Sequence, residues 1–175
     1  MITEKQLIRR FHQGDVRALR TIYDLYKHDL VTLAFALLCR KALAEDVVHD
    51  VFAKLLDNAQ QIRIKGSLRG YLLTAVANTA RNRNREPWVS RPTDREGRHR
   101  AESPERLVAQ KERHERLRHA LGQLPYEQRE VILLHCYANE RFRSIAKQLR
   151  ISINTVQGRY RYGLQKLRSL LDGEK

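Results

Sequence analysis

The chain has 175 residues, 42% of them hydrophobic, which fits one domain of ordinary size or two small ones. Its formal net charge of +14 is typical of a protein with a polyanionic partner such as nucleic acid, although a charge that merely keeps the protein in solution is the alternative. No uncharged run approaches the roughly 20 residues needed to span a bilayer, and the N-terminus lacks the apolar core of a signal peptide. We therefore expect a cytoplasmic protein without membrane insertion.

The positive charge is unevenly distributed along the chain. Residues 1–60 carry nine basic and eight acidic side chains, residues 61–100 carry ten and three, and residues 101–175 carry fifteen and nine. A charge that served solubility alone would not need this asymmetry. The excess therefore marks the segments where a phosphate backbone could bind.

Neither the cysteines nor the histidines indicate a metal site. Cys39 and Cys136 form no C-x-x-C pair, and both lie in apolar stretches, so we expect buried free thiols. The histidines show no H-E-x-x-H or similar spacing, and there is no glycine-rich phosphate loop. The sequence predicts no cofactor, no metal and no enzymatic activity.

The apolar spacing is helical in nearly the whole chain, so we expect an all-α fold. Near the N-terminus, Thr3 and Gln6 have the spacing of a capping box for a short helix that Gly14 closes. Asp15 is placed to cap the next helix, which carries one long apolar stripe.

Two further helices are expected before residue 86. One is predicted over Ala42–Asn58, and a second, capped by Ser67, extends to about Arg85. The segment between them, Ala59–Gly66, has the composition of a loop.

The helical pattern stops after Arg85. Residues Glu86–Ser103 contain two prolines, one glycine and many charges but hardly any apolar side chains, which is typical of a linker. Helical spacing resumes at Pro104, a residue suited to the first helical position. We expect two small helical domains, 1–85 and 104–175, joined by a flexible linker.

The C-terminal half has the pattern of a helix-turn-helix. A buried helix is predicted over Pro125–Tyr137, followed by a short helix containing Ala146 and by the turn Arg150–Ser152. Ser152 is placed to cap the final helix. A small residue such as Ala146 lets two helices cross closely, as this motif requires.

The final helix is apolar on one face and basic and amide-rich on the other. In a major groove, arginine can pair with guanine, asparagine or glutamine can pair with adenine, and glycine lets the backbone come close. An ordinary solvated helix face is the alternative. The residues of the polar face are Asn154, Gln157, Gly158, Arg161 and Arg168.

An acidic segment within Ala42–Asn58 contrasts with the basic chain. Glu45, Asp46, His49 and Asp50 lie within about one helical turn of one another. Acidic residues near a helix start also suit the helix dipole, so a purely structural role stays open. As a functional surface, this patch repels DNA and is better suited to a protein partner.

The loop Ala59–Gly66 and the end of the next helix form a basic, hydrogen-bonding segment. Such a segment could hold single-stranded nucleic acid, although a solvated helix end that suits the dipole is the alternative. Aromatic platforms are scarce, so we expect capture of one or two bases and not of a long stacked tract. The residues concerned are Arg63, Lys65, Asn78, Arg81, Asn82, Arg83 and Arg85.

The order of these segments resembles that of the extracytoplasmic-function (ECF) sigma factors. The resemblance rests on LAEDVVHDVFAKLL, SLRGYLLTAVANTARN, a polar linker and LPYEQREVILLHCYANERFRSIAKQLRISINTVQGRYRYGLQKLR, in that order. It covers both expected domains, which would correspond to sigma regions 2 and 4. It implies a factor that binds core RNA polymerase and directs promoter-specific transcription initiation on promoter DNA, with an anti-sigma factor as a third conceivable partner.

The resemblance also implies roles for matching positions. Docking on the clamp helices of the largest polymerase subunit is implied for Glu45, Asp46, His49 and Asp50. Recognition and melting of the −10 element are implied for the loop Ala59–Gly66 and for Arg63, Lys65, Asn78, Arg81 and Arg85. Reading of the −35 element is implied for Asn154, Thr155, Gln157, Gly158, Arg159 and Arg161.

Three positions depart from the residues usual in the family. His49 replaces a glutamine, Tyr71 replaces a tryptophan, and Arg150 replaces a glycine. A left-handed backbone at Arg150 would cost about 1 kcal/mol.

A stand-alone helix-turn-helix regulator is the competing interpretation. It explains the C-terminal half but leaves the acidic helix and the basic loop without a role. Co-purification with core RNA polymerase separates the two interpretations.

Overall fold

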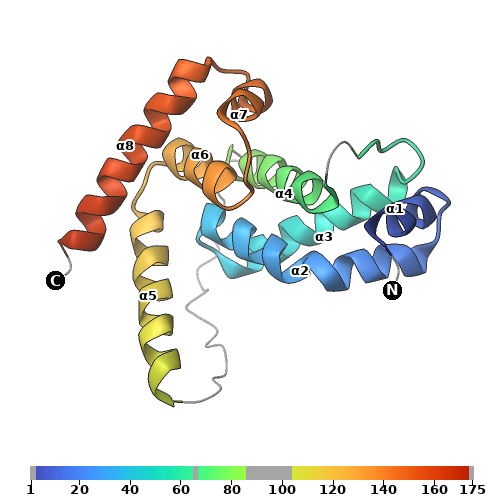
Figure 1. Cartoon of the computed structure of the whole chain (residues 1–175), viewed down its shortest axis with the longest axis horizontal. Helices are drawn as coiled ribbons and strands as arrows, with labels where there is room; N and C mark the ends of the chain where they lie inside the picture. The colour runs from blue at the N-terminus through green and yellow to red at the C-terminus, as the bar shows by residue number, and fades with distance from the viewer. Residues whose placement is uncertain (1–2, 65–66, 86–103, 174–175) are drawn as a thin grey trace. The chain divides into compact units, whose positions relative to one another are not determined.

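A computed structural model describes residues 3–64, 67–85 and 104–173, with side chains from residue 112 onward in the last of these ranges. Within them the chain forms eight α-helices and no strand, so the all-α prediction is confirmed (Figure 1). The chain divides into two compact units, Met1–Val89 and Ser90–Lys175. The linker expected over 86–103 lies outside the described residues, and its flexibility and the domain boundaries stay predictions.

The first unit contains α1 (Glu4–His12), α2 (Val16–Leu38), α3 (Lys41–Asp57) and α4 (Leu68–Arg85). The second contains α5 (Pro104–Gly122), α6 (Tyr126–Cys136), α7 (Phe142–Leu149) and α8 (Ile153–Asp172). The helices predicted over 42–58 and 125–137 agree with α3 and α6 to one residue at each end.

Side-chain caps set the helix starts of the first unit as the sequence predicts. The Gln6 N–H donates to Thr3 Oγ1 and the Thr3 N–H donates to Gln6 Oε1, which completes the capping box of α1. Asp15 accepts from the Arg17 N–H and caps α2. Between them, Gly14 has a φ of +82°, which glycine adopts without the strain of a Cβ atom.

The core of the first unit lies where α2, α3 and α4 pack against one another. Its aliphatic side chains are at most 4% exposed, and burying each of them contributes roughly 1.5–3 kcal/mol. This packing determines which faces of α3 and α4 remain accessible to a partner. The main contributors are Ile22, Leu30, Leu33, Leu37, Val47, Val51, Leu55, Leu68, Leu72 and Val76.

The second unit contains the predicted helix-turn-helix, with α8 packed against α5, α6 and α7. Ser152 caps α8 by accepting from the Thr155 N–H at 3.0 Å. At the crossing with α6, a Cβ atom on Gly163 would come within 2.8 Å of Ile132 Cδ1. A larger residue here would make the Ile132 side chain shift and would press on Gln128 Cβ at 3.1 Å, so the glycine suits the close approach of these two helices.

An aromatic cluster joins α6, α7 and α8 beneath the turn. The rings of His135 and Phe142 stack with centroids 4.2 Å apart, and the Tyr160 ring meets both edge-on at 5.1 Å. Nδ1 of His135 lies 2.8 Å from the carbonyl oxygen of Glu140, so this nitrogen carries the proton and donates. These contacts hold the final helix α8 against the rest of the motif.

The prediction that both thiols are buried is wrong, because Cys39 and Cys136 are both exposed. Each occupies a helix end, where the chain turns away from the apolar face that the neighbouring residues form. Cys39 is the C-cap of α2 with a left-handed φ of 56°, and Cys136 is the last residue of α6. The Cys136 sulfur lies 3.6 Å from the Tyr160 hydroxyl, which raises the pKa of that phenol together with its burial.

Arg150 has the left-handed backbone that the sequence predicts, with φ 55° and ψ 44°. Arg150→Gly should therefore raise the free energy of unfolding of the second unit by about 1 kcal/mol, measured by calorimetry of the full chain. Arg143→Gly removes the same side chain from the helical backbone of α7, and this change should lower the free energy of unfolding by about 1 kcal/mol. Equal effects of the two substitutions would show that backbone strain at Arg150 is negligible.

Candidate nucleic-acid and protein interfaces

The acidic face is the outward side of α3 formed by Glu45, Asp46, His49 and Asp50. The first three side chains are exposed and Asp50 is half-buried. They alternate at helical spacing with buried residues such as Val47 and Val51, which pack into the core. The structure thus brings together on one surface the four residues predicted as a docking patch.

Tyr23 of α2 borders the acidic face. It is half-buried, its hydroxyl lies 3.5 Å from Nε2 of His49, and the two rings are nearly parallel. Its ring also meets Phe52 edge-on, with centroids 5.0 Å apart. Helical periodicity cannot find such a residue, because Tyr23 lies at the boundary between the buried and exposed faces.

Asp50 connects the acidic face to the basic end of α4. Its Oδ2 lies 2.6 Å from Nη2 of Arg83, and both side chains are more than a third exposed. Solvent screening limits an ion pair of this exposure to about 0–1 kcal/mol of stability. The main effect of this ion pair is therefore to fix the orientation of the Asp50 and Arg83 side chains, and it adds little to stability.

Some of the polar residues at the basic end of α4 are half-buried, so this end is not simply a row of solvated side chains. Nη1 of Arg81 donates to Oδ1 of Asn78 at 3.0 Å, and both residues are half-buried. Arg85, at the end of the helix, and Arg63, in the preceding loop, are exposed. Lys65 lies outside the described residues.

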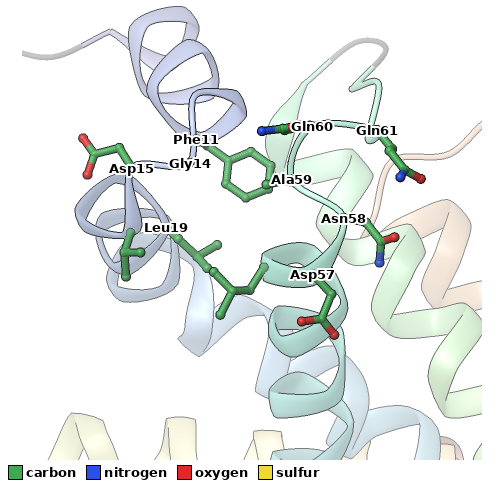
Figure 2. A pocket seen from close by; sticks show the side chains of 11 residues that line it. Phe11, Gly14, Asp15, Leu19, Asp57, Asn58, Ala59, Gln60 and Gln61 are labelled. Atoms are coloured by element: carbon green, nitrogen blue, oxygen red, sulfur yellow. The ribbon is translucent and has the colours of Figure 1, made fainter.

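A cavity of about 300 Å³ lies between the α1–α2 connection and the segment that follows α3. Apolar side chains line its interior, and carboxylates and amides surround them (Figure 2). Only the loop side is predictable from the sequence, because no local pattern shows that two connections more than 40 residues apart face each other. The lining residues are Phe11, Gly14, Asp15, Val16, Leu19, Leu56, Asp57, Asn58, Ala59, Gln60 and Gln61.

The N-terminal half of α8 presents the polar face predicted for the final helix. Asn154, Thr155, Gln157 and Arg161 are exposed, and Gly158 is half-buried. The Thr155 hydroxyl lies 2.8 Å from the Ser152 hydroxyl and takes part in the helix cap. Arg159 is also half-buried.

Two features of this face bear on contact with a ligand. A Cβ atom on Gly158 would meet nothing within 4 Å, so packing within the chain does not require this glycine. The Arg161 guanidinium lies 4.9 Å from the centre of the exposed Tyr162 ring and donates to its hydroxyl at 3.3 Å. Tyr162, which the helical pattern does not single out, therefore contacts Arg161 and favours this position of its guanidinium.

Within the described parts of the chain, no group of three histidine, cysteine, aspartate or glutamate side chains is placed to bind a metal ion. No helix in those parts is both long and apolar enough to cross a membrane.

Comparison with known proteins assigns both units. Residues 22–88 match the family model described as Sigma-70 region 2, and residues 114–167 match Sigma-70, region 4. The chain is also 25% identical over 159 residues to the ECF RNA polymerase sigma factor SigX of Bacillus subtilis (strain 168), an alignment that covers 86% of this chain and 82% of SigX. The chain belongs to the ECF sigma factors.

Solved structures share the fold of this sigma factor. CnrH, solved in complex with the cytosolic domain of CnrY, superposes with a TM-score of 0.67 at 22% identity, over 98% of this chain and 99% of CnrH. RpoE from Bartonella quintana, solved with the anti-sigma factor NepR, superposes with a TM-score of 0.62 at 20% identity, over 89% of this chain and 98% of RpoE.

Membership in this family establishes the function: the sigma factor binds core RNA polymerase and directs promoter-specific initiation through the −10 and −35 elements. Sigma factors are regulatory proteins and not enzymes. A stand-alone regulator is not favoured, because the region 2 match covers the half of the chain that this interpretation leaves without a role.

Proposed function

We propose that this sigma factor divides its work among three surfaces. The acidic face of α3 docks on core RNA polymerase, the cavity and the basic end of α4 open the −10 element, and the polar face of α8 reads the −35 element. The observation that carries the proposal is the separation of charge: the acidic face points outward from a chain of net charge +14 whose other two candidate surfaces contain arginines and amides. Like charges exclude the acidic face from DNA and favour a protein partner there.

Docking is assigned to Glu45, Asp46, His49 and Asp50. Exposed carboxylates form charge-assisted hydrogen bonds with basic side chains of a partner, and such contacts are stronger than neutral ones. Asp46 is the best probe, because it is exposed, whereas Asp50 is already paired with Arg83.

Charge reversal by Asp46→Lys should weaken the binding of core polymerase by about 1–3 kcal/mol, measured by fluorescence titration of the labelled sigma factor with core. Asp50→Lys should weaken it by a similar amount. Arg83→Gln is the matched control, since it removes the Asp50 partner but leaves the acidic face in place. Unchanged core affinity in Asp46→Lys, or an equal loss in Arg83→Gln, would remove the docking assignment.

Opening of the −10 element is assigned to the cavity, to Arg63 in the segment that follows α3, and to the basic end of α4. Extruding a base from the stack costs roughly a few kcal/mol, so a protein that melts DNA must bind the extruded base. The cavity offers apolar walls from Phe11 and Leu19 and hydrogen-bonding groups from Asn58 and Gln61, which suits the face and the edge of a base. The exposure of Arg63 and Arg85 supports a role in phosphate contacts, and Asn78 and Arg81, joined by a hydrogen bond, act as a pair.

Reading of the −35 element is assigned to Asn154, Thr155, Gln157, Gly158, Arg159 and Arg161. The exposed amides and Arg161 suit the edges of paired bases in a major groove. The open space around Gly158 supports a close approach of the helix backbone to DNA.

We further propose that this sigma factor works in the cytoplasm, has no enzymatic activity of its own, and is regulated by an anti-sigma factor. The location follows from its polymerase and promoter partners. The anti-sigma proposal is supported by RpoE, which was solved in complex with NepR.

A further inference from the structure

Helix α1 precedes the range matched by the region 2 model, which begins at residue 22, yet it contacts both ends of the loop between α3 and α4. At the first end, the Phe11 side chain is 3% exposed, lines the cavity, and is directed toward the buried Ala59 (Figure 2). At the second end, Oε1 of Glu4 accepts from the backbone N–H of Leu68 at 2.8 Å. One short helix therefore connects the end of the loop to the cavity wall.

The Glu4 contact completes the N-terminus of α4. The first N–H groups of a helix have no partner within it, and Glu4 satisfies the Leu68 N–H while Ser67 Oγ accepts from Gly70. Glu4 is also the first residue of α1, so its carboxylate lies at the positive ends of two helix dipoles. Because Glu4 and Leu68 are 64 residues apart, this contact ties α1 to α4 and is not a local cap.

Helix α2 also contacts the N-terminal end of α4. Nε of Arg69 donates to Oδ2 of Asp29 at 2.8 Å, one residue after the Leu68 contact. Tyr26 lies nearby: its burial, followed by the charge of Glu4, raises the pKa of its phenol. The start of α4 is thus fixed by side chains from both α1 and α2.

We propose that Glu4 is a positioning residue for promoter melting, holding the end of the α3–α4 loop and, through α1, the Phe11 wall of the cavity. The inference rests on the proposed function, in which this cavity binds an extruded base. A loop that must be ordered during binding loses part of the binding energy to conformational entropy, whereas a loop fixed at both ends does not. Without Glu4, the cavity remains but is less well organised for capture.

Glu4→Ala should slow open-complex formation on duplex promoter DNA roughly fivefold, the effect that corresponds to losing a helix-capping hydrogen bond. The rate is read from permanganate reactivity of thymines with holoenzyme assembled from the full chain. On a template already mismatched open at the −10 element, transcription should be unchanged, and core affinity should be unchanged as well. Glu4→Gln keeps the acceptor oxygen and should restore most of the rate, whereas the shorter Glu4→Asp should not.

Lys5→Ala is the control for a change at the exposed neighbouring position of α1 and should have no effect. A purely structural role for Glu4 would lower core affinity and activity on both templates together, and that result would overturn the inference. So would an unchanged duplex rate in Glu4→Ala.

Comparing Glu4→Ala with a variant that carries glycine and serine at residues 60–64 separates this inference from the proposed function. Intact melting in the loop variant alone contradicts the proposed function. Lost melting in the loop variant with full melting in Glu4→Ala contradicts only the role of Glu4.

Discussion

Replacing residues 60–64 with glycine and serine should abolish promoter melting and leave closed-complex binding intact. The replacement keeps the buried Ala59 and the helix cap Ser67, so the ends of α3 and α4 stay in place. It removes Gln60 and Gln61 from the cavity wall, together with the exposed Arg63. The cost of extruding a base, roughly a few kcal/mol, is then no longer offset by capture.

Permanganate footprinting of this variant should show no reactive thymines near the start site, while the −35 element remains protected from nuclease. Arg63→Gln is the matched control: it removes one charge but keeps the cavity wall, and it should slow melting only in part. Normal thymine reactivity in the loop variant would show that melting does not depend on this cavity.

Arg161→Ala should weaken recognition of the duplex −35 element by about 1–3 kcal/mol and relax specificity at one base pair. Arg161 is exposed on the polar face of α8, and its guanidinium lies 4.9 Å from the centre of the Tyr162 ring, so it is accessible to a base edge. Electrophoretic mobility shifts on promoters changed one base pair at a time measure both effects. Transcription from a template already open at −10 should be largely rescued, because this residue acts only in duplex recognition.

Lys166→Ala removes the same charge from an exposed position of the same helix and should weaken binding slightly and equally on all sequences. Loss of activity on the open template in Arg161→Ala would contradict the division between the two DNA-binding surfaces. A uniform loss across all promoter variants would reduce Arg161 to a phosphate contact.

Local chemistry made much of this structure predictable. The caps at Thr3, Asp15 and Ser152 lie where the sequence places them, since a cap is a contact between residues two or three positions apart. The left-handed backbone of Arg150 was expected from the family resemblance, because the ECF sigma factors usually have a glycine at this position. The acidic face of α3 and the polar face of α8 followed from helical periodicity, which separates inward from outward residues.

Contacts between distant residues were not predictable, because no local pattern encodes them. The Asp50–Arg83 pair and the Glu4–Leu68 hydrogen bond join residues 33 and 64 positions apart. In the second unit, Arg129 is 8% exposed within α6 and donates to the carbonyl of Leu121 at the end of α5, a tertiary role that its charge alone would argue against.

The cysteines show the opposite error, in which a local pattern was misleading. Apolar neighbours suggested burial, but Cys39 and Cys136 end α2 and α6, where the helical periodicity no longer applies. Predictions from periodicity are therefore weakest in the last turn of a helix.

Run-off transcription with purified core RNA polymerase on a library of genomic fragments tests the central claim most directly. Core alone should give only background transcription, and core with this sigma factor should give discrete transcripts whose upstream regions share two spaced elements. Addition of Asp46→Lys in place of the natural chain should reduce all of these transcripts together. The account would be contradicted if the chain bound the same DNA fragments with and without core polymerase and no specific transcripts appeared. That result would favour a stand-alone DNA-binding regulator.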